Sequence, residues 1–281
     1  MRLYFLIKLF AEFNVIIYSV KQLNLRNMIC TILGCGGSSG VPEIGCGCFT
    51  CSSPNPKNKR LRSSIYIQSK TTSILVDTSP DLRQQALTHG IKYLDAILYT
   101  HDHGDHICGI DDTKSFARSG CIIPTFLNQS TYDTLTQRFP YIFKQASLLY
   151  PVRLQTNILK YNHAFQVGDI DIISFPQIHG KIISTGFRFG ELAYSTDLNE
   201  LTNQAIEVLA GVQIWIVDCL RYAWAPTHSY LERTISWSDK IKPELTILTH
   251  MAHDIEYAEI KKILPQNIIP AFDGLKINFN Q

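Results

Sequence analysis

The chain reads Thr100-His101-Asp102-His103-Gly104-Asp105-His106 directly after the apolar stretch Ala96-Ile97-Leu98-Tyr99. The apolar stretch predicts a buried strand, and the polar run then lies on a loop where alternate side chains can turn toward one point. Neutral imidazole and carboxylate oxygen are the usual ligands of zinc, manganese and iron in proteins. Three histidines and a carboxylate this close together behind a strand indicate a metal site, whereas one or two loop histidines would not.

Further polar residues follow other predicted strands. His179, Asp197 and His250 each come just after an apolar segment. These segments span residues 170–175, 186–194 (a hairpin turning at 190–191) and 245–248. Strands and helices alternate in two successive halves, which predicts two sheets packed together with helices outside. The strand ends would then bring these side chains to one edge of the sandwich.

The size and composition predict an ordinary soluble protein. The 281 residues are 45% hydrophobic and 18% charged, which is typical of globular chains that bury a sizeable core. The 26 basic and 24 acidic residues leave a net charge of +2, so no overall field attracts nucleic acid or an anionic membrane. The cluster Lys57, Lys59, Arg60 and Arg62 is open to two interpretations, a patch that faces phosphate or a solvated loop.

We expect a single domain over residues 28–281, because this part contains no repeat, low-complexity tract or linker. Residues 1–27 form an N-terminal extension of a different character. Their apolar segment, residues 3–20, is interrupted by Lys8 and Glu12, so it is too short to span a bilayer. Met28 stands immediately before the first predicted strand. Our hypothesis is that Met28 is the natural start, or that residues 1–27 are an appended helix.

The cysteines follow a metal-binding pattern. Cys46-Gly47-Cys48-Phe49-Thr50-Cys51 places three thiols on one tight loop, where they cannot easily bridge to one another but suit zinc. Thiols of this kind need a reducing compartment, which predicts a cytoplasmic location. The remaining cysteines are expected to be small buried apolar residues: Cys30, Cys35, Cys108, Cys121 and Cys219.

These motifs resemble the metallo-β-lactamase superfamily of metal-dependent hydrolases, over residues 28–270. The resemblance implies a four-layer αβ/βα sandwich and a dinuclear centre of two divalent ions, zinc or manganese. It implies that one ion is held by His101, His103 and His179. It implies that the other is held by Asp105, His106 and His250, with Asp197 bridging both.

A closer resemblance is to the branch that contains phosphoribosyl 1,2-cyclic phosphate phosphodiesterase. It rests on Leu33-Gly34-Cys35-Gly36-Gly37-Ser38-Ser39-Gly40-Val41-Pro42 and on the three-cysteine loop. This resemblance implies a structural zinc bound by Cys46, Cys48, Cys51 and His253. It also implies that His228 binds phosphate or protonates the leaving group, and that the protein forms a homodimer.

The expected function is hydrolysis of a small phosphodiester, cyclic or otherwise compact. Two adjacent ions make a nucleophile from water at neutral pH and neutralise charge on the phosphate. The leaving oxygen then needs a proton, from Asp105 or from His228. By position, Asp77 and Asp102 are expected to orient ligand histidines. The alternatives are an RNA-processing nuclease of the ribonuclease Z type and a non-hydrolytic role like that of pyrroloquinoline-quinone biosynthesis protein B. The charge balance and the lack of a long basic arm argue against nucleic acid, and no membrane partner is expected.

Overall fold

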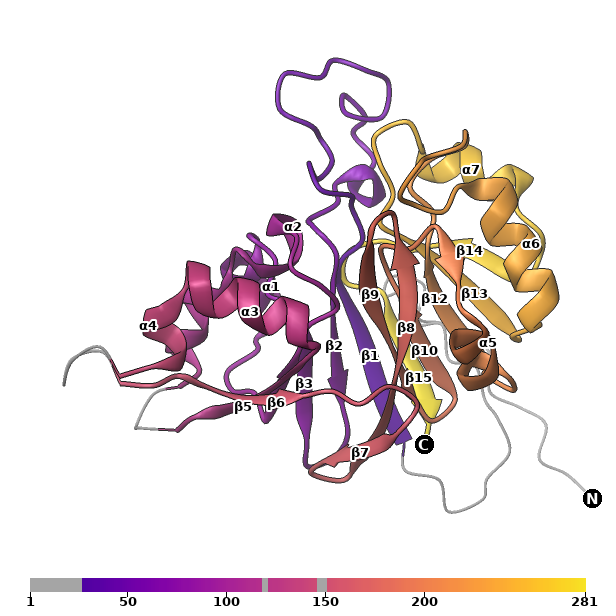
Figure 1. Cartoon of the computed structure of the whole chain (residues 1–281). Coiled ribbons are helices and arrows are strands. Elements are labelled where there is room, and N and C mark those ends of the chain that lie inside the picture. The colour runs from indigo at the N-terminus through magenta and orange to yellow at the C-terminus, as the bar shows by residue number, and fades with distance from the viewer. Residues whose placement is uncertain (1–26, 118–120, 146–150) are drawn as a thin grey trace, which may run out of the picture.

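The computed structural model describes residues 27–117, 121–145 and 151–281. The hypothesis about residues 1–27 therefore lies outside the described part of the chain, apart from Asn27. Two sheets face each other, with helices on both outer sides (Figure 1). This layering confirms the predicted four-layer αβ/βα sandwich.

The first sheet has the strand order β15-β1-β2-β3-β4-β5-β6. Its strands are β1 (Asn27–Gly34), β2 (Ser64–Gln68), β3 (Ser73–Val76), β4 (Ala96–Leu98), β5 (Ile123–Leu127), β6 (Leu154–Ile158) and β15 (Lys276–Asn280). The pairs from β3 to β6 are parallel and the others are antiparallel. Its outer face carries α1 (Leu82–His89), α2 (Gly104–Ile107), α3 (Gln129–Arg138) and α4 (Pro140–Phe143) (Figure 1).

The second sheet repeats this plan with the order β11-β8-β9-β10-β12-β13-β14, and β7 pairs with β8. Its strands are β7 (Ala164–Val167), β8 (Ile170–His179), β9 (Ile182–Phe189), β10 (Leu192–Ser195), β11 (Glu200–Leu201), β12 (Ile214–Asp218), β13 (Leu245–Thr249) and β14 (Ile268–Pro270). The outer helices are α5 (Asn203–Leu209), α6 (Leu231–Ile241) and α7 (Tyr257–Ile263). Short 3-10 turns span Pro56–Asn58 and Ile110–Ser115. None of the helices in the described part of the chain has the length and apolar character needed to cross a bilayer.

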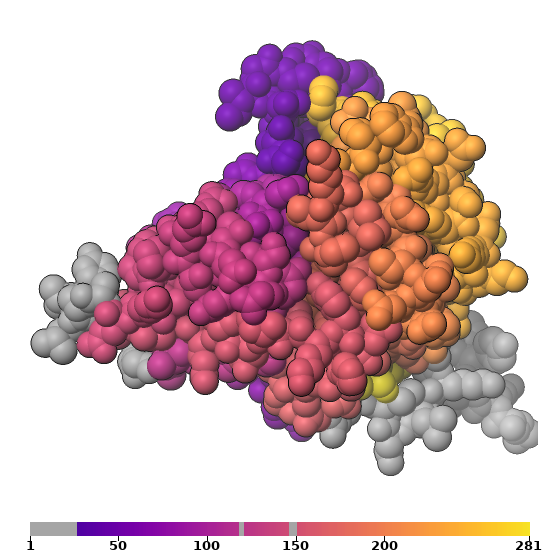
Figure 2. All heavy atoms as spheres, viewed as in Figure 1, coloured from indigo at the N-terminus to yellow at the C-terminus, as the bar shows by residue number. Residues whose placement is uncertain are grey.

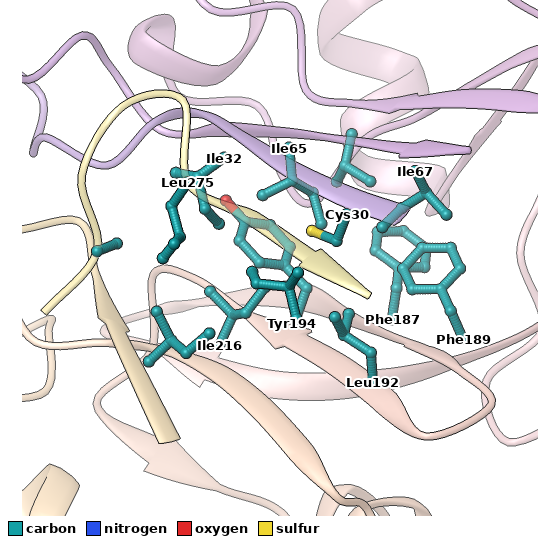
Figure 3. Packing of buried hydrophobic residues seen from close by; sticks show 14 of the residues in the cluster. Cys30, Ile32, Ile65, Ile67, Phe187, Phe189, Leu192, Tyr194, Ile216 and Leu275 are labelled. Carbon is teal, nitrogen blue, oxygen red and sulfur yellow. The ribbon is translucent and has the colours of Figure 1, made fainter. Parts of the chain in front are cut away.

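The main core fills the space between the sheets (Figure 3). Cys30 and Ile65 of the first sheet face Phe187, Tyr194 and their neighbours of the second. Alternation along β1 and β9 places these side chains inward, because successive residues of a strand point to opposite faces. Each sheet also packs against its outer helices through one smaller cluster of buried hydrophobic residues. This packing holds the strand ends in place at one edge.

We expect Phe187→Ala to lower the free energy of unfolding by about 3–5 kcal/mol, because the change leaves a cavity in a close-packed core. Phe187 is fully buried between the sheets. Ile183→Ala is the matched control on the same strand, since Ile183 is 41% exposed, and it should cost less than about 1 kcal/mol. Urea unfolding of both variants measures the difference. Similar losses in the two variants would contradict the assigned core.

Two expectations from the sequence are wrong in detail. Cys108 and Cys121 are exposed, because the short segments that carry them run over the surface. Arg60 fits neither interpretation of the basic cluster, a phosphate-facing patch or a solvated loop, because only 2% of it is exposed.

Candidate metal centres

The predicted ligands come together where strands of both sheets end. α2 and the turn between β8 and β9 lie at the same end of the sandwich (Figure 1). Asp77 and His250 follow strands directly, Asp197 follows one after a single residue, and their φ angles are 65°, 56° and 54°. A left-handed backbone is uncommon for residues other than glycine and costs about 1–3 kcal/mol. Three strained polar residues at one edge indicate a functional site there.

Two groups of side chains share Asp197. The first group contains His101, His103, His179 and Asp197, and the second contains Asp105, His106, Asp197 and His250. In each group the four ligand atoms lie within 4.8 Å of one another. The structure therefore brings all seven predicted residues together in the predicted arrangement. Their assignment as metal ligands stays a prediction.

The chemistry of the donor set fits a pair of cations. The ring nitrogens His103 Nδ1 and His179 Nε2 lie 3.2 Å apart, and His101 Nε2 is buried without a hydrogen-bond partner among the described residues. Burial lowers the pKa of His101 well below its usual range, which keeps the ring in the neutral form that binds metal. Burial would raise the pKa of Asp197, but His250 and His106 outweigh it and hold that pKa well below its usual range. Asp197 is therefore a carboxylate, as a bridging ligand must be.

Neighbouring groups orient the rings. His106 Nδ1 donates to Asp77 Oδ2 at 2.8 Å, and His179 Nδ1 donates to the carbonyl of Thr227 at 2.6 Å. These bonds leave the Nε2 atom of each ring for the cluster. The predicted orienting role of Asp77 thus agrees with its contacts. The one expected for Asp102 does not, because its carboxylate accepts from Thr134 Oγ1 at 2.6 Å on α3.

His228 lies beside the cluster with Asp218 behind it. Its Nδ1 donates to Asp218 Oδ2 at 2.9 Å, and its ring stacks on His250 with centroids 4.8 Å apart. Burial lowers the pKa of His228, but the carboxylates, Asp218 foremost, outweigh burial and raise it to about 9. The pKa of Asp105 is held well below its usual range by His106, despite burial. Of the two predicted proton donors, His228 is therefore the one that carries a proton at neutral pH.

A cleft of about 540 Å³ opens next to His228. Its lining includes Ser38 and Ser39 of the glycine-rich loop, Arg221, and His253 of the cysteine cluster. The cleft is large enough for a small molecule.

The second predicted site also assembles. Cys46, Cys48, Cys51 and His253 offer four ligand atoms within 4.8 Å of one another. Cys46 Sγ and Cys48 Sγ lie 3.5 and 3.4 Å from His253 Nδ1. The backbone amide of Cys51, with His253, lowers the pKa of Cys48 to about 6, whereas burial raises that of Cys51 to about 11. Ionisation of Cys51 therefore requires a cation beside it, as a zinc ion would provide.

Two functional groups beside the dinuclear group were not predicted from the sequence. Asp218 is the last residue of the buried strand β12, and a carboxylate at the end of an apolar strand is the signal that could have identified it. The carbonyl of Thr227 had no signal at all, because any residue type supplies a carbonyl.

Residues 72–251 match the family model described as the β-lactamase superfamily domain. Among solved structures, the chain is similar to a diphosphatase from the PhnP family, with 39% identity and a TM-score of 0.85. That alignment covers 91% of this chain and 98% of the diphosphatase.

Two curated relatives are similar over part of their length. An octanoyltransferase of Porphyromonas gingivalis is 34% identical over 252 residues, which are 89% of this chain and 51% of the relative. A ribonuclease Z of Bradyrhizobium sp. is 27% identical over 139 residues, which are 48% of this chain and 46% of the relative. The chain thus spans about half the length of the curated relatives it matches.

Proposed function

Because this chain belongs to the β-lactamase superfamily and resembles its PhnP branch, we propose that it is a metal-dependent hydrolase of compact phosphodiesters. One observation carries the proposal: two groups of ligand atoms share Asp197, next to a cleft lined by His228, whose ring is hydrogen-bonded from behind by Asp218. The shared ligand groups support binding of a pair of ions, and the His228–Asp218 pair supports protonation of a leaving oxygen.

The residues divide the reaction between them. His101, His103 and His179 would hold one ion, and Asp105, His106 and His250 the other, with Asp197 shared. Two divalent ions, zinc or manganese, supply Lewis acidity and a nucleophilic hydroxide when bound. His228 Nε2, on the ring edge opposite the bond to Asp218, donates a proton to the leaving oxygen. Asp218 holds that ring in orientation and stabilises its protonated form.

The cleft limits the substrate. Since His228 lines the cleft, the leaving alcohol occupies it, among lining residues that include Ser38, Ser39 and Arg221. Its volume of about 540 Å³ suits a group of the size of a sugar or nucleoside. We also propose a structural zinc in the Cys46, Cys48, Cys51 and His253 group, and a cytoplasmic protein that acts as a homodimer.

Ribonuclease Z activity is the second candidate, favoured by the similarity to the Bradyrhizobium relative. Cleavage of a transfer-RNA precursor at rates above those for small diesters would select it.

The octanoyltransferase is about twice as long as its match, so its acyl chemistry is not transferred to this chain. Hydrolysis of a thioester substrate by this protein would instead indicate acyl chemistry. If a variant of Asp197 keeps its full function in cells, the result would favour a non-hydrolytic role like that of pyrroloquinoline-quinone biosynthesis protein B.

The test is hydrolysis of bis(p-nitrophenyl) phosphate by protein loaded with zinc or manganese. We expect turnover, and a loss of about a hundredfold or more in Asp105→Ala, because one ion loses a carboxylate ligand. Asp102→Ala is the matched control from the same seven-residue run, since Asp102 binds Thr134 and not the cluster. Absence of turnover in protein that has both ions bound would refute the proposed function.

A further inference from the structure

Arg60 closes the loop that carries the three clustered cysteines. Its backbone pairs with that of Val41, with Arg60 N donating to Val41 O at 2.7 Å and Val41 N to Arg60 O at 2.9 Å. Residues 41–60, called here the Cys-rich excursion, project above the body of the molecule (Figure 2). Arg60 thus stands at the base of this excursion, where it joins the sandwich.

The side chain of Arg60 reaches the segment that carries His250 and His253. Nη1 donates to the carbonyl of Ala252 at 3.1 Å, and Nη2 donates to that of Ile255 at 2.7 Å. These two carbonyls lie on either side of His253 in the chain. Because the guanidinium is planar with fixed donor directions, two bonds from it fix the backbone of this segment more firmly than one flexible donor could.

Asn58 reinforces the same connection. Its Oδ1 accepts from Arg60 Nη2 at 3.2 Å and from the backbone amide of Tyr257 at 2.8 Å. Its Nδ2 donates to Glu256 Oε1 at the start of α7. Arg60 and Asn58 are both buried, so these bonds are sheltered from water, where they are worth more than at the surface.

The other side of the segment is held by the glycine-rich loop. Met251 N donates to Cys35 O at 2.8 Å, and Gly37 N donates to Met251 O at 3.3 Å. His250 therefore keeps its left-handed backbone between two fixed supports, the glycine-rich loop and the Arg60 side chain. From there its ring points to the dinuclear group, while His253, three residues on, points to the cysteines.

We propose that Arg60 is a positioning residue that couples the two metal sites. It holds residues 250–256 so that His250 and His253 are aimed at different clusters, although its own hydrogen bonds reach none of the seven predicted ligands of the dinuclear group. This inference rests on the proposed binding of metal in both clusters. It predicts that a change at the base of the Cys-rich excursion weakens metal binding in the dinuclear group.

The test uses the full chain, stripped of metal and titrated with cobalt(II) against a competing chelator. Thiolate-to-cobalt charge-transfer absorption reports the cysteine cluster, and the weaker visible bands of nitrogen- and oxygen-bound cobalt report the dinuclear group. We expect Arg60→Met to lower the cobalt affinity of both, by about tenfold to a hundredfold, as loss of groups that orient ligands does. Arg60→Lys should restore part of it, because the ammonium can still reach one carbonyl.

Arg188→Met is the matched control. Arg188 also donates to backbone carbonyls, those of Gly190, Val208 and Ala210, but at β9 and α5, away from both clusters. Affinity losses confined to the cysteine cluster, losses in neither cluster, or equal losses in Arg188→Met would each overturn the proposal. If Arg60→Met does not fold, Arg60→Lys carries the test, and unchanged affinity of its dinuclear group overturns the proposal. Cobalt binding without diester turnover would refute the proposed function alone.

Discussion

Asp197→Asn is expected to remove both ions of the dinuclear centre and to lower kcat/KM on bis(p-nitrophenyl) phosphate by about a thousandfold or more. Asp197 is the residue common to both groups of ligand atoms. The substitution deletes its charge but keeps its shape, and asparagine tolerates the left-handed backbone of this position. Elemental analysis of metal per chain, together with steady-state kinetics, measures the two effects.

The comparison with Asp105→Ala makes this prediction specific. Asp105 belongs to one group only, so its loss should release one ion and leave the other. Asp197→Asn should therefore lose more ions per chain than Asp105→Ala. If the dinuclear centre of Asp197→Asn keeps both of its ions, in addition to the proposed structural zinc, the bridging assignment is wrong.

His228→Asn is expected to lower kcat by about 10²–10⁴-fold on a diester whose leaving group is a sugar hydroxyl, the range that general acid catalysis supplies. A 2′,3′-cyclic nucleotide is such a substrate. The effect should be small on bis(p-nitrophenyl) phosphate, because p-nitrophenolate leaves without being protonated. The structural reason is that His228 faces the cleft and is held from behind by Asp218.

His163→Asn, at an exposed histidine remote from the cleft, is the control and should change neither rate. The metal content of His228→Asn should stay at the level of the unchanged protein. Equal losses on both substrates would show that His228 acts on phosphate binding or on the ions and does not protonate the leaving group.

The choice between the carboxylates of the 100–106 run shows how far the sequence leads. The spacing of the histidines identified a metal site, but two aspartates stand equally close to them. Resemblance to a family selected Asp105, and the fold supplies the reason: α2 begins at Gly104 and turns Asp105 toward His250, while Asp102 turns to Thr134 on α3. The direction of a side chain depends on the helix packed beside it, which residues 100–106 do not encode alone.

The sequence by itself indicated two packed sheets with helices outside and polar side chains gathered at one edge, because strand periodicity and residue type at strand ends are local properties. The predicted membership of the two clusters came from resemblance to a family. Only the tertiary structure decided which groups stand behind the ligands. Asp218 meets His228, and Arg60 meets the carbonyls of Ala252 and Ile255, through packing of segments that are far apart in the chain or share no pattern. A hydrogen bond to a backbone carbonyl leaves no trace in residue identity, since every residue carries one.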